Sequence, residues 1–154
     1  MTDYFMIACG EAEAGMQGGL YGPFGAVVVK DGEVVGKGNN QVVATHDSTA
    51  HAEIVALRRA ELTLGTHDLT GCEIYTTCYP CPMCLGAIMW ARISTVHYGC
   101  TSDEAAAIGF DDRAFYQALV NPDKNHLVQL QQHDVPECRS LFKKWINLEN
   151  RQMY

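Results

Sequence analysis

The chain has 154 residues, of which 47% are hydrophobic and 19% charged, as in an ordinary globular domain. Its formal net charge of −7 argues against a nucleic-acid partner, because a nucleic-acid surface needs clustered lysines and arginines. No apolar run approaches the ~20 residues of a membrane span and the first residues lack a secretory signal, so we expect a cytoplasmic protein with no membrane partner.

The first part of the chain predicts a helix followed by a β-hairpin. Apolar residues that end at a glycine-rich stretch predict the helix at about residues 2–16. A β-branched run predicts a buried strand at residues 24–29. The turn signal Asp31-Gly32 then returns the chain into a second strand at residues 34–38.

In the rest of the chain, helices are expected to alternate with strands. A helix capped by Ser48 or Thr49 should run to about Leu62. Strands are then expected at residues 72–77, 95–98 and 127–130, and helices at 81–91, 114–120 and 135–148.

The long connection over residues 99–126 favours a parallel pairing of the fourth and fifth strands, because an antiparallel neighbour needs only a tight turn. We therefore expect one α/β domain over residues 1–154. Its architecture would be a three-layer α/β/α sandwich with a mixed five-stranded sheet, in which strands 4 and 5 are parallel.

A metal-binding pattern joins two of the predicted helix starts. His51, Cys81 and Cys84 supply one imidazole and two thiols, which would leave the fourth position of a tetrahedral zinc open for water. Glu53 would lie beside that water as a base and not as a ligand. The order His-x-Glu, then Pro-Cys-x-x-Cys, is typical of zinc-dependent nucleobase deaminases. Since zinc lowers the pKa of a coordinated water to about 7, Glu53 can pass a water proton to a ring nitrogen.

Other uses of the cysteines have to be weighed. A structural zinc needs four protein ligands, and Cys78 is the one nearby candidate for a fourth. A redox pair would not need His51 or Glu53. The seven cysteines are an odd number, which in a reducing compartment favours metal binding or burial over disulfides. We therefore favour a catalytic zinc, with Cys78 packing at a strand end. Small buried side chains are expected at Cys9, Cys72, Cys100 and Cys138.

The stretches TAHAEIVALR (49–58) and CPMCLGAI (81–88) resemble the cytidine deaminase superfamily. Within it, GFDD (109–112) and the last residue, Tyr154, are similar to the bacterial guanine deaminases. PFGAV (23–27) and MWAR (89–92) fit as well, so the resemblance covers nearly the whole chain. It implies a cytidine deaminase-like fold, one Zn²⁺ per subunit, and the hydrolytic deamination of the purine guanine to xanthine and ammonia.

The resemblance also implies substrate-binding residues. Phe24 would stack on the purine, although a core aromatic at a strand start fits equally well. Asn40 would bind the purine edge with its amide, which both donates and accepts, and Asn39 is an alternative. The backbone N–H of Ala52 would bind the guanine carbonyl. Trp90 would line the pocket, unless it packs in a helix core.

Two further implied features come from the end of the chain. Asp112 would be a second proton carrier, toward the leaving ammonia; otherwise it would cap a helix, which Asp111 can also do. In guanine deaminases the C-terminal segment crosses to a neighbouring subunit and closes its site. Residues 150–154, including Tyr154, would then form a swapped lid in a homodimer.

Two departures from the family pattern affect the substrate more than the zinc. Tyr79 stands where family members usually have Glu, and His46-Asp47-Ser48 replaces a more usual Asp-Pro. The alternatives are a tRNA adenosine deaminase, against which the acidic charge argues, and a deaminase of cytosine or a triazine. A catalytically silent zinc-binding dimer is a fourth possibility, against which Glu53 argues.

Overall fold

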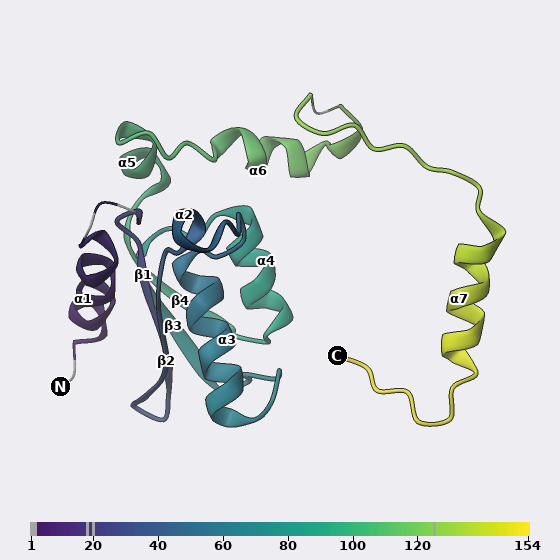
Figure 1. Ribbon diagram of the computed structural model, residues 1–154, viewed down its shortest axis with the longest axis horizontal. Helices are drawn as coiled ribbons and strands as arrows, with labels where there is room; N and C mark the ends of the chain where they lie inside the picture. Colours follow the sequence, from purple (N-terminus) through teal and green to yellow (C-terminus); the bar gives the residue numbers. More distant parts are fainter. Residues whose placement is uncertain (1–2, 18, 20, 125) are drawn as a thin grey trace. The chain divides into compact units, whose positions relative to one another are not determined.

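A mixed four-stranded sheet lies at the centre of residues Met1–Ala114, the first of two units into which the chain divides (Figure 1). The strands are β1 (Gly25–Lys30), β2 (Glu33–Asn39), β3 (Cys72–Cys78) and β4 (Thr95–Cys100), in the spatial order β2-β1-β3-β4. β1 pairs antiparallel with β2 and with β3, whereas β3 and β4 are parallel. This computed structural model describes residues 3–17, 19, 21–124 and 126–154.

The helices follow the predicted order with two additions. They are α1 (Tyr4–Met16), α2 (Val42–Thr45), α3 (Ala52–Leu64), α4 (Pro82–Trp90), α5 (Ser102–Ala107), α6 (Arg113–Val120) and α7 (Pro136–Ile146), with a 3₁₀ turn at Pro122–Lys124. The sequence missed α2 and α5 because four and six residues are too few to show a helical period. Residue 2, where the first helix was expected to start, lies outside the described residues.

The predicted fifth strand is wrong, and so is the parallel pairing of strands 4 and 5. Residues 127–130 are exposed and have no strand structure, so the described chain forms four strands. The parallel pair is β3 and β4, because α4 lies between them as the crossover that parallel neighbours require. An apolar run shows that a segment tends to be buried, but it does not show which sheet edge it will meet.

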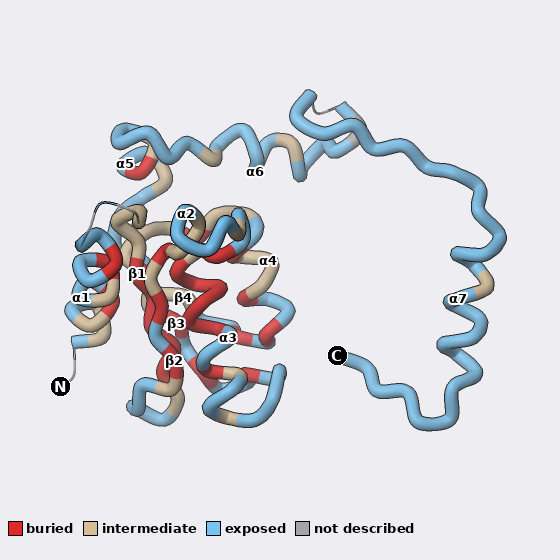
Figure 2. The backbone as a smooth tube through the Cα atoms, in the orientation of Figure 1, coloured by how far each residue is buried: buried red, intermediate tan, exposed pale blue. Residues whose placement is uncertain are grey.

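Helices cover both faces of the sheet in this unit, with α1 on one face and α3 and α4 on the other (Figures 1 and 2). Glycines permit the close approach: a Cβ at Gly25 would collide with the Ala8 carbonyl of α1, and one at Gly36 with the Ala56 carbonyl of α3. The strand β1 between these layers is buried on both sides. The expected α/β sandwich is confirmed for this unit.

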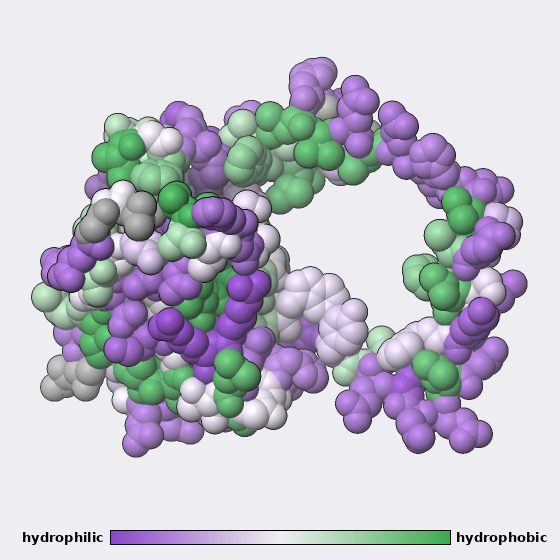
Figure 3. All heavy atoms as spheres, viewed as in Figure 1, coloured by the Kyte–Doolittle hydropathy of each residue, from purple (hydrophilic) through white to green (hydrophobic). Residues whose placement is uncertain are grey.

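The second unit, Phe115–Tyr154, has a different character. None of its described side chains is buried. Its main element, α7, is amphipathic: Figure 3 shows apolar side chains along one side of the helix and polar ones along the other. Leu141, Phe142 and Ile146 are more than half exposed. No helix in the described part of the chain is both long enough and apolar enough to cross a membrane.

Candidate metal centre and active site

Two helix starts carry the predicted metal ligands. His51 is the N-cap residue of α3, and Cys81 is the N-cap residue of α4, whose first helical position is a proline. The expected cap at Ser48 or Thr49 is therefore wrong. The Asp47 carboxylate accepts hydrogen bonds from the backbone N–H and the hydroxyl of Thr49 (2.8 and 2.6 Å), which forms a turn and delays the helix until Ala52.

The three ligand side chains meet at one point, as the spacing predicted. Nδ1 of His51 lies 3.5 Å from Sγ of Cys81 and 3.5 Å from Sγ of Cys84. A tetrahedral zinc with Zn–S of about 2.3 Å and Zn–N of about 2.0 Å places neighbouring ligand atoms about 3.5–3.8 Å apart. All three ligand atoms lie within 4.8 Å of one another, so the donor set and its spacing fit zinc.

The chain itself prepares a thiolate at this point. Hydrogen bonds donated by the Cys84 thiol, the His51 ring and the backbone N–H of Cys84 lower the pKa of Cys81 to about 4. The same proton sharing raises the pKa of Cys84, because its thiol is the donor. A bound Zn²⁺ would hold both sulfurs as thiolates.

Glu53 lies in the first turn of α3 and has only 8% of its surface exposed. Burial is the main cause that raises the pKa of its carboxyl, and the nearby Cys81 thiolate acts in the same direction. A buried carboxyl with a raised pKa, two residues from a metal ligand, is suited to take up and return a proton.

Asp112 is the second carboxyl that the fold brings to this centre. It is half-buried, and burial followed by the charge of Cys81 raises its pKa. Asp111 instead accepts the backbone N–H of Arg113 at the start of α6 (3.1 Å). The capping role that the sequence left open between the two aspartates thus belongs to Asp111, and Asp112 lies within electrostatic reach of His51 and Cys81.

The comparison with known proteins agrees with this geometry. Residues 2–100 match the family model of the cytidine and deoxycytidylate deaminase zinc-binding region. The chain belongs to this deaminase family.

Its relatives include enzymes that act on different bases. Guanine deaminase of Bacillus subtilis is 44% identical over 91% of this chain and 90% of its own length. The X-ray structure of the Bacillus subtilis guanine deaminase superposes with a TM-score of 0.94 at 41% identity, covering 100% of this chain and 99% of that one. A tRNA-specific adenosine deaminase of Aquifex aeolicus is 33% identical over 93% of this chain and 92% of its own. The deaminase is therefore a guanine deaminase homologue in a family of zinc aminohydrolases.

Three of the implied substrate-binding residues of the deaminase lie near the ligand-bearing end of α3, namely Phe24, Asn40 and Ala52. Asn40 is buried, donates its backbone N–H to the Phe24 carbonyl (3.1 Å) and accepts the Val42 N–H on its side chain (3.2 Å). Ala52, also buried, is the first helical residue, whose N–H has no partner within the helix. Asn39, the alternative residue for binding the purine edge, instead packs its side chain against Gly15 of α1.

The other two implied residues are placed differently. Trp90 ends α4, nine residues after Cys81 and so about 13 Å further along the helix. It is 62% exposed, and the Arg92 guanidinium lies 5.7 Å from its ring centroid. This position excludes the helix-core alternative and does not bring Trp90 to the metal ligands. Tyr154 belongs to the second unit, where it is exposed.

Some residues of the deaminase site were missed in the sequence. Phe110 packs edge-on against Phe24, with ring centroids 4.9 Å apart. Arg113 pairs with Asp111 and Asp103. Both residues flank the two aspartates of GFDD, so their position in the sequence could have drawn attention to them. Only the folded turn shows which partners they contact.

The residues that depart from the family pattern do not enter the ligand cluster. Tyr79 packs edge-on against Tyr98 of β4, with ring centroids 5.0 Å apart.

Cys78, the candidate fourth ligand, is the last residue of β3 and donates to the Thr101 carbonyl (3.7 Å), and burial raises the pKa of this thiol to about 11. It packs at a strand end, as expected, and does not complete a four-ligand site.

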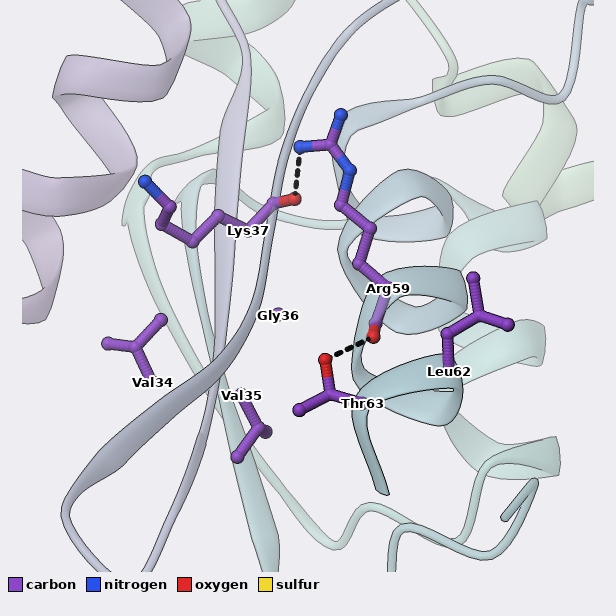
Figure 4. A pocket seen from close by; sticks show the side chains of 7 residues that line it. All are labelled: Val34, Val35, Gly36, Lys37, Arg59, Leu62 and Thr63. Carbon is purple, nitrogen blue, oxygen red and sulfur yellow. Dashed lines mark hydrogen bonds between the residues drawn. The ribbon is translucent and has the colours of Figure 1, made fainter. Parts of the chain in front are cut away.

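A groove of about 410 Å³ lies elsewhere on the deaminase, between β2 and the second half of α3 (Figure 4). It is lined by Val34, Val35, Gly36, Lys37, Arg59, Leu62 and Thr63. Arg59 follows His51 by eight residues, or about 12 Å of helix. The groove therefore has no part in the metal centre.

Proposed function

We propose that the protein is a zinc-dependent guanine deaminase, which hydrolyses guanine to xanthine and ammonia. The observation that carries the proposal is the buried Glu53 carboxyl beside three ligand atoms with tetrahedral zinc spacing. The high identity to guanine deaminase of Bacillus subtilis supports guanine over other bases.

The proton steps are assigned to two carboxyls. His51, Cys81 and Cys84 would hold the zinc ion, which would supply an activated water at neutral pH. Glu53 accepts a proton from this water and donates it to a ring nitrogen of guanine. As the C–O bond forms and the C–N bond breaks, Asp112 helps to deliver the proton with which the amino group leaves as ammonia. Guanine and water are thereby converted to xanthine and ammonia with no other reactant.

The purine is held by groups around the start of α3. Phe24 stacks on its ring and is itself held by the edge of Phe110. The side chain of Asn40 binds the purine edge, and the Ala52 N–H binds the carbonyl oxygen. Trp90, which is exposed at the end of α4, lines the pocket only where another subunit brings it close.

The proposed assembly is a cytoplasmic homodimer of single-domain subunits. Residues 150–154 form a lid that crosses to the partner's site, so that Tyr154 excludes water from the bound purine. The apolar side of α7, which is not buried within its own unit, supports a role for this region in subunit contact.

A substrate panel tests the proposal. Purified zinc-loaded protein is supplied in turn with guanine, adenine, cytosine and a tRNA anticodon stem, and released ammonia is measured. We expect turnover of guanine at least a hundredfold faster than of the other three, because the site binds the purine edge and carbonyl together. Faster reaction of the anticodon stem would replace guanine deamination with deamination of tRNA adenosine, the activity for which the Aquifex aeolicus relative is named. Inertness toward all four would leave a catalytically silent zinc-binding protein.

A further inference from the structure

The turn that carries Asp112 is fastened to the end of α5. The backbone N–H groups of Gly109 and Phe110 donate to the carbonyls of Ala106 and Ala105, each at 3.0 Å. Gly109 has φ of +100°, a conformation that side-chain-bearing residues rarely adopt. The course of the backbone into Asp112 is therefore set from its N-terminal side.

On the other side of Asp112, one arginine holds the turn. Nε of Arg113 donates to Oδ1 of Asp111 (2.8 Å) and a terminal guanidinium nitrogen donates to Oδ2 (2.6 Å), so the pair is two-pronged. The other terminal nitrogen donates to Oδ1 of Asp103 in the first turn of α5 (3.3 Å). One guanidinium thus connects the start of α6 to the start of α5.

The far anchor of this connection is itself firm. α5 begins directly after β4 with a complete capping box, in which the Thr101 hydroxyl accepts the Glu104 N–H and the Glu104 carboxylate accepts the Thr101 N–H (2.7 Å). Through Asp103, Arg113 is tied to a helix start that the sheet positions.

We propose that Arg113 is a positioning residue that holds the Asp112 carboxylate against the metal centre through Asp111 and Asp103. The inference deepens the proposed function, since it rests on Asp112 as a proton carrier. Arg113 does not touch the reacting atoms. Its three partner oxygens belong to carboxylates on either side of the turn, so the guanidinium opposes any swing of residue 112 away from Cys81.

Because these ion pairs lie at the surface, their loss should affect catalysis more than the stability of the fold. Arg113, Asp111 and Asp103 are all about half or more exposed, and exposed ion pairs contribute little to global stability. A displacement of about 1 Å in a catalytic group can nevertheless cost about a hundredfold in rate. Arg113→Gln should therefore lower kcat roughly ten- to hundredfold, with little change in KM or melting temperature.

A double-mutant cycle tests whether Arg113 acts through Asp112. Steady-state guanine turnover is measured for wild type, Arg113→Gln, Asp112→Asn and the double variant. We expect the double variant to be as slow as Asp112→Asn, because the clamp then has no carboxylate to position. Losses that multiply would overturn the proposal, as would full activity of Arg113→Gln. Arg59→Gln, an exposed arginine that donates to the Lys37 carbonyl, is the matched control.

The variant Arg113→Lys distinguishes the two-pronged geometry of the guanidinium from its positive charge. Arg113→Lys keeps the positive charge but cannot make the two-pronged contact, so it should lose about as much activity as Arg113→Gln. Full activity of the lysine variant would contradict a role for the two-pronged contact between Arg113 and Asp111.

A readout without turnover keeps this inference distinct from the choice of substrate. Amide hydrogen exchange of residues 105–113 in zinc-loaded protein should become at least several-fold faster in Arg113→Gln, while the zinc content stays at one per subunit. Unchanged exchange would overturn the clamp even in an active enzyme. Faster exchange in a protein that is inert toward guanine would support the clamp and contradict only the proposed substrate.

Discussion

Glu53 is the residue on which the proposed chemistry depends most. Its substitution by Gln keeps the shape and burial of the side chain but removes its ability to carry a proton. We expect Glu53→Gln to lower guanine turnover by about 10²- to 10⁴-fold, the usual contribution of a general acid–base group. Ammonia release and zinc content by atomic absorption are the measurements.

Glu61→Gln, near the other end of the same helix, is the matched control and should keep full turnover. A zinc content that falls together with activity in Glu53→Gln would show that Glu53 supports the metal and does not carry the proton. Turnover within a few-fold of wild type would equally contradict its role.

Among the elements, the start of α3 depends on a short turn before His51. The hydrogen bonds from Thr49 hold the pKa of Asp47 below its usual value of 3.8, and Arg58 adds a weaker attraction at 3.7 Å. Since this pKa is lower in the folded than in the unfolded chain, the carboxylate stabilises the fold above about pH 4. That contribution is lost as pH falls through the lowered pKa.

We therefore expect Asp47→Asn to lower the melting temperature by a constant amount between pH 5 and 8. The difference from wild type should shrink below about pH 4, where wild-type Asp47 becomes protonated as well. Thermal melts at a series of pH values measure this. A difference that grows on acidification would show that Asp47 does not act through its charge.

The same helix is seated on β2 by a glycine. A Cβ at Gly38 would collide with the Ala52 carbonyl and lie 2.6 Å from the backbone nitrogen of Ala56. We expect Gly38→Ala to destabilise the zinc-loaded protein by about 1–3 kcal/mol, as overpacking does, and to weaken zinc binding because Ala52 adjoins His51. Urea unfolding and a competitive zinc titration are the measurements.

Gly10→Ala in α1 is the matched control, because a Cβ there meets nothing within 4 Å. Alanine at this helical position should stabilise the protein by up to about 1 kcal/mol. Equal effects of the two substitutions would show that the close contact of α3 with β2 is not what requires glycine at residue 38.

For the whole molecule, the proposed swapped lid predicts complementation between two defective proteins. A chain that lacks residues 150–154 should keep its zinc but lose guanine turnover, and full-length Glu53→Gln should be inactive as well. After the two are unfolded together and refolded with zinc, half of the dimers are mixed, and one site in each has both an intact Glu53 and a lid. Activity should return to about a quarter of wild type.

Ammonia release from the refolded mixture measures this, with each protein refolded by itself as the control. Full activity of the truncated chain would remove the lid altogether. An inactive mixture of zinc-loaded dimers would show that the tail closes the site of its own subunit.

The local parts of this protein were readable from its sequence. His51 and Glu53 share one helix start, and Cys81 and Cys84 share another, so their short spacings already determine their relative positions. The buried strand β1, the turn at Asp31-Gly32 and the existence of the last helix, α7, were predicted for the same reason. Periodicity and turn preference act over a few residues, where the backbone has few choices.

Which distant segments meet is set by the folded chain and not by any local pattern. The fold paired β3 with β4 and left residues 127–130 without a strand. It also gave the side chains of Asn39 and Asn40 different surroundings, beside Gly15 of α1 and next to the Val42 N–H respectively. It also placed Arg113 between the carboxylates of Asp103 and Asp111, the first of which lies ten residues before Arg113. These outcomes depend on which surfaces bury one another and where each loop closes, and a local pattern contains neither. The short motifs therefore identify the zinc ligands and their chemistry, whereas the fold sets how the second carboxyl is brought to them.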